Sequence, residues 1–322
     1  MASKTFLQAI RDAQYEEMAR DPAVFVMGED VECNMFGTTT GMIADFGAER
    51  VRDTPIAEAG MAGVAAGAAM VGMRPIVDFT IAPFLYPAMD QIISIIAKSR
   101  YLYGGQAKVP VVLRANLIYG NGNAAQHSDR PYSMFMHMPG LKIMVPSSAY
   151  EMKGLMKSAI RDDDPVMSFE DVALWSTKSE IPDEEYLIPF GKANRVREGK
   201  DCTIVAIGAM VNHALGAADA LAEEGIGVEI IDPRTLAPLD SATILESVRK
   251  TGRLVVVDSA FGRCSAASEI AAIVSDEGFW DLRAPIVRVT TENTHIPFSS
   301  SLEAQLYPSK DKVIAAVRRT LS

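Results

Sequence analysis

Two groups of side chains in this sequence could take part in acid–base chemistry, and the first centres on Glu58. This glutamate follows an apolar pair and precedes a run of Gly, Ala and Met at 61–72. A carboxylate that enters such an apolar environment is costly unless it is paired or protonated. A glutamate at the start of a helix is also favoured by the helix dipole, which is the plainer interpretation. The neighbouring residues leave a functional carboxyl and a simple helix-terminal carboxylate equally open.

The second group is a loop rich in Gly and Asn at 116–140, which holds His127 and His137, two of the four histidines in the chain. The loop follows a predicted strand at 109–114, and ligands of open α/β sheets bind where the strands end. A lone histidine is usually structural, but this pairing favours a polar active-site loop. Because no third ligand stands nearby, the pair does not indicate a metal site.

A run of three aspartates, Asp162–Asp164, has some resemblance to a hard-cation site. The usual explanation of such a run is a solvated turn ahead of a strand. The alternative is a cation held partly by backbone carbonyls, and these residues alone do not establish it.

Alternating strand and helix patterns supply the elements that must position these side chains. Short apolar or β-branched runs alternate with helical patterns, which is typical of parallel α/β units. Strands are predicted at 23–27, 109–114, 142–145, 166–169, 203–207, 228–231, 254–257 and 286–289. Helices are predicted at 4–20, 62–71, 88–101, 149–161, 211–224 and 302–319. The predicted fold class is therefore α/β.

The domain organisation follows from length and from one change in composition. A chain of 322 residues is long enough for about two domains. The stretch 177–201 is polar, with few periodic apolar residues, as expected of a linker. We place the boundary near Pro189, which gives domains at 1–188 and 189–322.

The segment after Glu58 has an unusual composition for a helix. Its glycines at 60, 63 and 67 lie on about one helical face, where another backbone can approach closely. Glycine lowers helix propensity, so tight packing must compensate. The plainer interpretation is a buried helix in a domain core, and the sharper one is a helix packed against a partner chain or a cofactor.

Charge and motifs exclude several classes of function. The net charge of −10 disfavours a nucleic-acid partner, because phosphate binding requires clustered Lys and Arg. There is no GxGxxG, P-loop or GxSxG motif, so nucleotide binding through those loops and serine hydrolysis have no support.

Cysteine usage and hydropathy predict a cytoplasmic protein with no membrane association. The three cysteines are widely spaced and form no CxxC pair, which fits a reducing compartment. No apolar run reaches the roughly 18 to 20 residues that cross a bilayer. The N-terminus is an amphipathic helix pattern with both charge signs, which is unlike a secretory signal or a transit peptide.

Several segments together carry a resemblance to a known family, through their order and spacing. They include Met27-Gly-Glu-Asp-Val, Arg50-Val-Arg-Asp-Thr-Pro-Ile-Ala-Glu, Gly72-Met-Arg-Pro-Ile, Ala125-Gln-His-Ser, His137-Met-Pro-Gly, Asp164-Pro-Val and Ile231-Asp-Pro-Arg-Thr. Over nearly its whole length the chain resembles the β subunit of the E1 component of thiamin-diphosphate-dependent 2-oxo acid dehydrogenases, within the transketolase-like group. The resemblance implies two three-layer α/β/α domains, a pyrimidine-binding domain and a transketolase C-terminal domain.

The resemblance also implies roles for particular residues. Glu58 matches the glutamate that hydrogen-bonds N1′ of the cofactor's aminopyrimidine ring, and Phe84 matches the aromatic residue that packs on that ring. His127 matches a histidine that lines the substrate channel near the reactive carbon, and His137 would lie one layer further out. Backbone oxygens of a potassium site in some relatives match Val111, Ala159, Ile160, Asp162 and Asp164.

The same resemblance implies a partner subunit. Relatives that bind the cofactor diphosphate through Mg²⁺ use a Gly-Asp-Gly motif, and this chain has none. An E1 α subunit would therefore supply that half of the site in an α2β2 heterotetramer. A lipoyl-bearing E2 acyltransferase would then accept the acyl group derived from a 2-oxo acid such as pyruvate.

The chain departs from the family pattern near the expected substrate channel. Asp129 and Arg130 follow His-Ser where Gln is common, Asn34-Met35 replaces Gly-Gly, and Pro87 and Ser259 replace a polar residue and a glutamate. These changes bear on substrate identity more than on cofactor use. The second half is most similar to β subunits of the acetoin dehydrogenase type.

Two rival functions remain open from the sequence. One is a non-catalytic assembly subunit, which the joint presence of Glu58, Phe84 and His127 argues against. The other is a transketolase-type or sulfo-acid enzyme with a different acceptor. Dependence of the enzyme on lipoyl-E2 as acceptor would distinguish a 2-oxo acid dehydrogenase from this last hypothesis.

Overall fold

The computed structural model describes residues 1–120 and 122–322 and divides the chain into two compact units. The first unit comprises Met1–Ile118 and Met134–Phe190, and the second comprises Tyr119–Ser133 and Gly191–Ser322. The chain therefore enters the second unit twice, first for a short loop and then for the whole C-terminal part. Of the helices in the described residues, none has the length and apolar content needed to span a bilayer.

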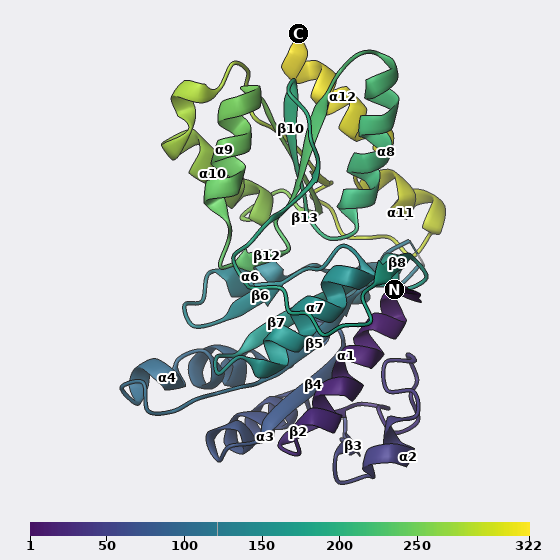
Figure 1. The fold of residues 1–322 in the computed structure, drawn as a ribbon, viewed down its shortest axis with the longest axis vertical. Helices are drawn as coiled ribbons and strands as arrows, with labels where there is room; N and C mark the ends of the chain where they lie inside the picture. The colour runs from purple at the N-terminus through teal and green to yellow at the C-terminus, as the bar shows by residue number, and fades with distance from the viewer. Residues whose placement is uncertain (121) are drawn as a thin grey trace. The chain divides into compact units, whose positions relative to one another are not determined.

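A parallel sheet forms the centre of the first unit (Figure 1). Its strands run in the order β6-β7-β5-β4-β2-β3, and each neighbouring pair is parallel. The bounds are β2 Val24–Gly28, β3 Val51–Asp53, β4 Arg74–Ile81, β5 Val112–Leu117, β6 Lys142–Met144 and β7 Val166–Asp171. Every residue of β5 and of β7 is buried, as expected for strands that are covered on both faces.

Two long helices of the first unit pack against each other, α1 (Phe6–Arg20) and α7 (Ala149–Arg161). A capping box starts α1: the Thr5 side chain accepts from the Gln8 amide, and the Gln8 side chain accepts from the Thr5 amide. Ser148 caps α7 in the same way through the Glu151 amide.

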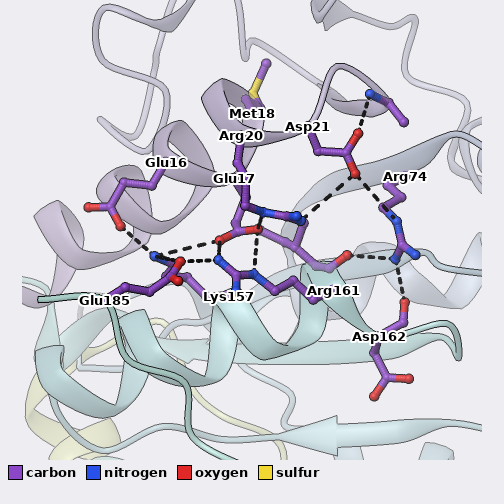
Figure 2. Close-up of polar contacts among 12 residues, drawn as sticks. Glu16, Glu17, Met18, Arg20, Asp21, Arg74, Lys157, Arg161, Asp162 and Glu185 are labelled. Carbon is purple, nitrogen blue, oxygen red and sulfur yellow. Dashed lines mark hydrogen bonds and ion pairs between the residues drawn. The ribbon is translucent and has the colours of Figure 1, made fainter.

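Charged side chains connect α1 to α7 (Figure 2). Glu17 on α1 is fully buried and accepts from Arg161 at 2.7 and 2.9 Å. Lys157 on α7 is also buried and lies 2.9 Å from Glu16 and 3.2 Å from Glu185. Buried charges of opposite sign in contact compensate one another's loss of hydration, so this pairing fixes how the two helices meet.

A second sheet forms the centre of the second unit, with strand order β14-β13-β10-β11-β9. Its strands are β9 Asn194–Arg197, β10 Cys202–Ala206, β11 Val228–Asp232, β13 Leu254–Phe261 and β14 Val287–Thr291, and β9 alone pairs antiparallel. The helices α8 (Met210–Glu223) and α12 (Lys310–Leu321) contact each other on one face of the sheet, and α9 (Ser241–Thr251) contacts α10 (Ala266–Glu277) on the other (Figure 1).

Shorter elements complete the two units. They are β1 Ala2–Thr5, α2 Met42–Phe46, α3 Glu58–Met70, η1 Ala82–Ala88, η2 Gln91–Ile96, α4 Ser99–Leu102, α5 Ala124–His127, α6 Tyr132–Met136, η3 Val172–Leu174, β8 Lys178–Ile181, β12 Thr235–Ala237, η4 Phe279–Asp281 and α11 Ser300–Leu306. β1 and β8 form a separate antiparallel pair.

The α/β class predicted from the sequence is confirmed, whereas several predicted elements differ in detail. The helix predicted at 302–319 is two helices, α11 and α12, because Pro308 between them lacks an amide to continue the hydrogen bonding. The helix predicted at 88–101 is a succession of a 3₁₀-helix, a π-helix and the short α4. The strands β3 and β4 were not predicted at all.

The glycine-rich helix α3 is buried on only one face. Met61, Ala62, Ala65, Ala66 and Ala69 face the core. The glycines at 60, 63 and 67 are exposed. A Cβ atom added at 67 would have no neighbouring atom within 4 Å. The interpretation of this segment as a helix wholly inside a core is therefore wrong for its glycine face.

Candidate active site

Polar side chains gather at the carboxyl edge of the parallel sheet in the first unit. Glu29 directly follows β2, Thr54 follows β3, and Thr80 and Asn116 lie near the ends of β4 and β5. One buried side-chain oxygen of each of these residues has no hydrogen-bond partner among the described residues. Buried polar atoms in proteins are nearly always hydrogen-bonded, so these oxygens indicate a place where a ligand supplies donors. The carboxyl edge is also where open α/β sheets bind their ligands.

The backbone at Thr80 has an uncommon conformation that shapes this edge. Thr80 has a positive φ of 64°, and the pairing of β4 with β5 shifts register between Asp78 and Ile81. A β-branched residue with positive φ is strained and persists only where its surroundings hold it. The Thr80 amide donates to Asp78 at 2.9 Å, and its carbonyl accepts from Asn116 at 2.5 Å. The bulge therefore sets where the ends of both strands point.

Glu58 is the first residue of α3 and is half-buried. A carboxylate there is favoured by the helix dipole, as the plainer sequence interpretation supposed. It also lies near a second carboxyl group, that of Glu29. Burial raises the pKa of Glu29, and the negative charges of Glu58, Asp30 and Asp78 raise it further. The Glu29 carboxyl therefore keeps a proton more readily than an isolated glutamate does.

Phe84 lies in η1, which begins immediately after β4 ends, and its ring is half-buried. The 3₁₀-helix contains Pro83, which is buried, and Pro87, which is exposed. The structure thus brings Phe84 to the same end of the sheet as Glu58 and Glu29. An aromatic ring beside hydrogen-bonding carboxyls is an arrangement that fits a flat heteroaromatic group.

The two histidines of the predicted active-site loop belong to different units of the structure. His127 is the last residue of α5, half-buried, and belongs to the second unit. His137 follows α6, is exposed, and belongs to the first unit. The loop 116–140 therefore divides between the two units.

Four of the five carbonyl groups expected around potassium already receive hydrogen bonds. Arg74 donates to the carbonyls of Ile160 at 3.1 Å and Asp162 at 2.9 Å (Figure 2). The carbonyl of Val111 accepts from the Val166 amide at 2.9 Å, and that of Ala159 accepts from the Asp162 amide at 3.3 Å. Lys142 lies 2.6 Å from Asp162 and 3.3 Å from Asp164. An ion at this place would share its ligands with two basic side chains.

Within the described residues, no three or more His, Cys, Asp or Glu side chains are arranged to hold a metal ion. The carboxyl edge nevertheless fits the pyrimidine end of a cofactor, because its orphaned oxygens are acceptors for ring and amino N–H groups. Sequence reasoning missed Glu29, Thr80 and Asn116 as members of this edge. The signal available for Glu29 was its position directly after a predicted strand, and Thr80 lay in a strand that was not predicted.

Both units match known protein families. Residues 2–174 match the transketolase pyrimidine-binding domain, and residues 191–313 match the transketolase C-terminal domain. A solved structure described as a split-gene transketolase, inactive β4 tetramer, superposes with a TM-score of 0.81 at 27% identity and covers 98% of each chain. The chain is thus a transketolase-like two-domain protein of the thiamin-diphosphate-dependent class.

Similar proteins of known function define the family within this class. The chain is 46% identical to the β subunit of acetoin:2,6-dichlorophenolindophenol oxidoreductase of Cupriavidus necator, over 100% of this chain and 98% of the relative. It is 44% identical to the β subunit of the pyruvate dehydrogenase E1 component of Rickettsia felis, over 98% and 97%. The chain belongs to the family of E1 β subunits of 2-oxo acid and acetoin dehydrogenases, and it is an oxidoreductase subunit of that type.

Proposed function

We propose that this chain is an E1 β subunit that helps to decarboxylate a pyruvate-like 2-oxo acid and to pass the acyl group to the lipoyl group of an E2 partner. The observation that carries the proposal is the carboxyl edge of the first sheet, where Glu58, Glu29 and orphaned acceptor oxygens lie at or after the ends of neighbouring strands. Acetoin cleavage is the alternative, supported by the 46% identity to an acetoin oxidoreductase β subunit.

Each proposed residue has one task. Bound thiamin diphosphate supplies the carbanion chemistry. Glu58 holds a proton against N1′ of the pyrimidine ring, and Glu29 nearby has a pKa raised by burial and by the surrounding negative charges. Phe84 packs on the same ring and fixes its orientation. His127 offers a polar contact to the substrate carboxylate, with His137 further out.

The proposal requires an α subunit. This chain has no Gly-Asp-Gly, so the partner would provide the main Mg²⁺ ligands and the diphosphate contacts in an α2β2 tetramer. The exposed glycine face of α3 supports close packing against another chain. Potassium held by backbone oxygens of Val111, Ala159, Ile160, Asp162 and Asp164 remains part of the proposal.

The cellular compartment of the enzyme is proposed from the state of its cysteines. Cys33, Cys202 and Cys264 are all unpaired, as is usual in a reducing compartment. We therefore place the assembled enzyme in the cytoplasm.

We place the domain boundary at 188/189, close to the point where the chain passes from Phe190 in the first unit to Gly191 in the second.

The test is a calorimetric titration of thiamin diphosphate with Mg²⁺ into the chain alone and into its mixture with the α-like protein of the adjacent reading frame. We expect tight binding only in the mixture. Tight binding by the chain alone would contradict the split site, and no binding in either case would favour a non-catalytic assembly subunit.

Substitution of Glu58 tests the chemistry itself. Glu58→Gln should keep the fold and the assembly but lower turnover of 2-oxo acid or acetoin by about 100-fold or more. Glu277→Gln makes the same chemical change at an exposed position on α10 and should leave turnover unchanged. Near-normal turnover of Glu58→Gln would refute the assignment of this residue.

A further inference from the structure

The first end of the loop that carries His127 is held by a buried carboxylate. Glu303 on α11 is fully buried, and its two oxygens accept from the amides of Gly120 at 2.7 Å and Gly122 at 3.1 Å. Tyr307 donates its hydroxyl to the same carboxylate at 3.2 Å. A carboxylate that accepts from backbone amides makes charge-assisted hydrogen bonds, which are stronger than neutral ones.

The other end of the loop is held by a buried guanidinium. Arg130 is 5% exposed and donates to the Ser259 hydroxyl at 2.8 Å and to the Ser128 carbonyl at 3.2 Å. Its guanidinium carbon lies 4.3 Å from the centre of the Tyr119 ring, at the opposite end of the loop. The Arg130 side chain therefore contacts both ends of the segment at once.

Arg130 is buried without a carboxylate in ion-pair contact among the described residues. The ring of Tyr307 lies 5.3 Å from its guanidinium carbon, so the two tyrosines provide much of its surroundings. A buried charge of this kind costs stability unless its contacts compensate. Its hydrogen bonds to the loop and to β13, together with the negative charge of Asp258, supply that compensation, which indicates that holding the loop is its role.

A third contact fixes the residue that follows. Tyr132 is fully buried and donates its hydroxyl to Asp258 on β13. Asp258 is itself held, because it accepts from the Ala260 amide at 2.9 Å. His127 stands between these anchors, at the end of α5, and all of the anchoring residues belong to its own unit.

We infer that Glu303 and Arg130 are positioning residues for His127, which they hold by fixing the two ends of the loop 119–133. The inference rests on the proposed function only where it assigns His127 to the substrate. It also assigns a role to Arg130 in the unusual Asp129-Arg130 sequence, because the Arg130 side chain binds its own unit rather than substrate.

The test uses the complete enzyme, assembled with its α partner, in three variants. Glu303→Gln keeps the size of the side chain but turns one acceptor into a donor that faces a backbone amide. Arg130→Met removes the guanidinium, and Arg130→Lys is the conservative rescue. Asp240→Asn is the matched control, because Asp240 is a buried carboxylate in the same unit that accepts from the amides of Ala193 at 3.0 Å and Thr243 at 3.2 Å.

Two readouts are measured on each variant. The first is the rate at which diethyl pyrocarbonate modifies His127, determined by mass spectrometry relative to the exposed His295. The second is kcat and KM for the 2-oxo acid or acetoin, together with the dissociation constant of thiamin diphosphate. The first readout does not depend on the activity of the enzyme.

We expect Glu303→Gln and Arg130→Met to raise the relative modification rate of His127 and to lower kcat by about 100-fold, as for a misplaced catalytic group. Cofactor affinity should stay unchanged, Arg130→Lys should recover part of kcat, and Asp240→Asn should change none of these values. Unchanged His127 reactivity in Glu303→Gln, or an equal effect of Asp240→Asn, would overturn the inference. If the parent enzyme turns over neither substrate, the proposed function fails, while the modification rates still decide whether the loop is anchored.

Discussion

At the scale of single residues, the distinctive feature is the pair of carboxyl groups at Glu29 and Glu58. Neither residue contacts a basic side chain in ion-pair geometry among the described residues. The nearest charges that act on Glu29 are negative, and burial works in the same direction. The raised pKa of Glu29 favours its protonated form, which suits a site that must keep a proton in place.

This pair predicts a dependence of stability on pH. Folding raises the pKa of Glu29 above its ordinary value of 4.5, so its ionised form costs stability. That cost is fully present above the folded-state pKa and fades as the pH falls through that value toward 4.5. Glu29→Gln should therefore be more stable than the parent at about pH 8, by an amount that shrinks at about pH 5.

Urea unfolding of both proteins at the two pH values measures this difference, with Glu277→Gln as the control. An advantage of Glu29→Gln that grows as the pH is lowered would contradict the direction of the pKa shift.

A second residue-scale prediction concerns the charges inside the first sheet. Arg114 is 1% exposed and lies 2.7 Å from Glu170 and 2.8 Å from Asp78, which are buried as well. Arg114→Met would leave two buried carboxylates without their cation and should cost about 3 to 5 kcal/mol of unfolding free energy.

Arg318→Met is the matched control, because it removes an ion pair with Glu224 that is open to solvent. Denaturant titration should show a large loss for the first variant and little change for the second. Equal losses would mean that burial does not decide the strength of these ion pairs.

Part of the candidate site could be proposed from local motifs together with the family resemblance. Glu58, Phe84 and His127 could be singled out because local motifs and the family resemblance mark them. Asn116 and Thr80 could not, because they become neighbours only through the bulge that joins β4 to β5. A hydrogen bond between residues in different strands depends on strand order and register, which single-sequence patterns do not encode.

At the scale of elements, α3 is a helix that packs against its own unit on one face only. Its alanines and Met61 pack inside the unit, while its glycines have no neighbour that would resist a side chain. Gly67→Leu should therefore leave the isolated chain at least as stable, since leucine gains about 0.8 kcal/mol of helix propensity over glycine. The same change should weaken assembly with the α subunit, because it fills the surface on which another backbone is expected to lie.

Sedimentation of the mixture measures this effect. Gly216→Leu on α8 is the control, since an added Cβ there meets only the Lys310 side chain at 3.6 Å. Normal assembly of Gly67→Leu would show that the glycine face of α3 is not the contact surface.

Elements were predicted best where the local sequence carries the signal. The strand β7 has a strong pattern, and the helices α1 and α7 have strong patterns and clear caps. The helix predicted at 88–101 was wrong as one regular helix, because its hydrogen bonding has the π pattern at Gln91–Ile96 and the separate short helix α4 follows. Such irregular helices are favoured by packing within the folded unit and leave no fixed period in the sequence.

At the scale of the whole molecule, the sequence was sufficient for the class of protein. The α/β class followed from alternating patterns, and the family followed from many short segments in one order. The excursion of residues 119–133 into the second unit could not be foreseen, because it depends on contacts with Ser259, Asp258 and Glu303, which are remote in sequence.

That excursion has a consequence for recombination between relatives. A single crossover between Phe190 and Gly191 would give a chimera whose His127 loop comes from one parent and whose anchoring residues come from the other. Arg130 in such a chimera would meet whichever residue the second parent has in place of Ser259. Exchange of the C-terminal unit should therefore preserve function only when 119–133 and 191–322 are transferred together as two linked cassettes.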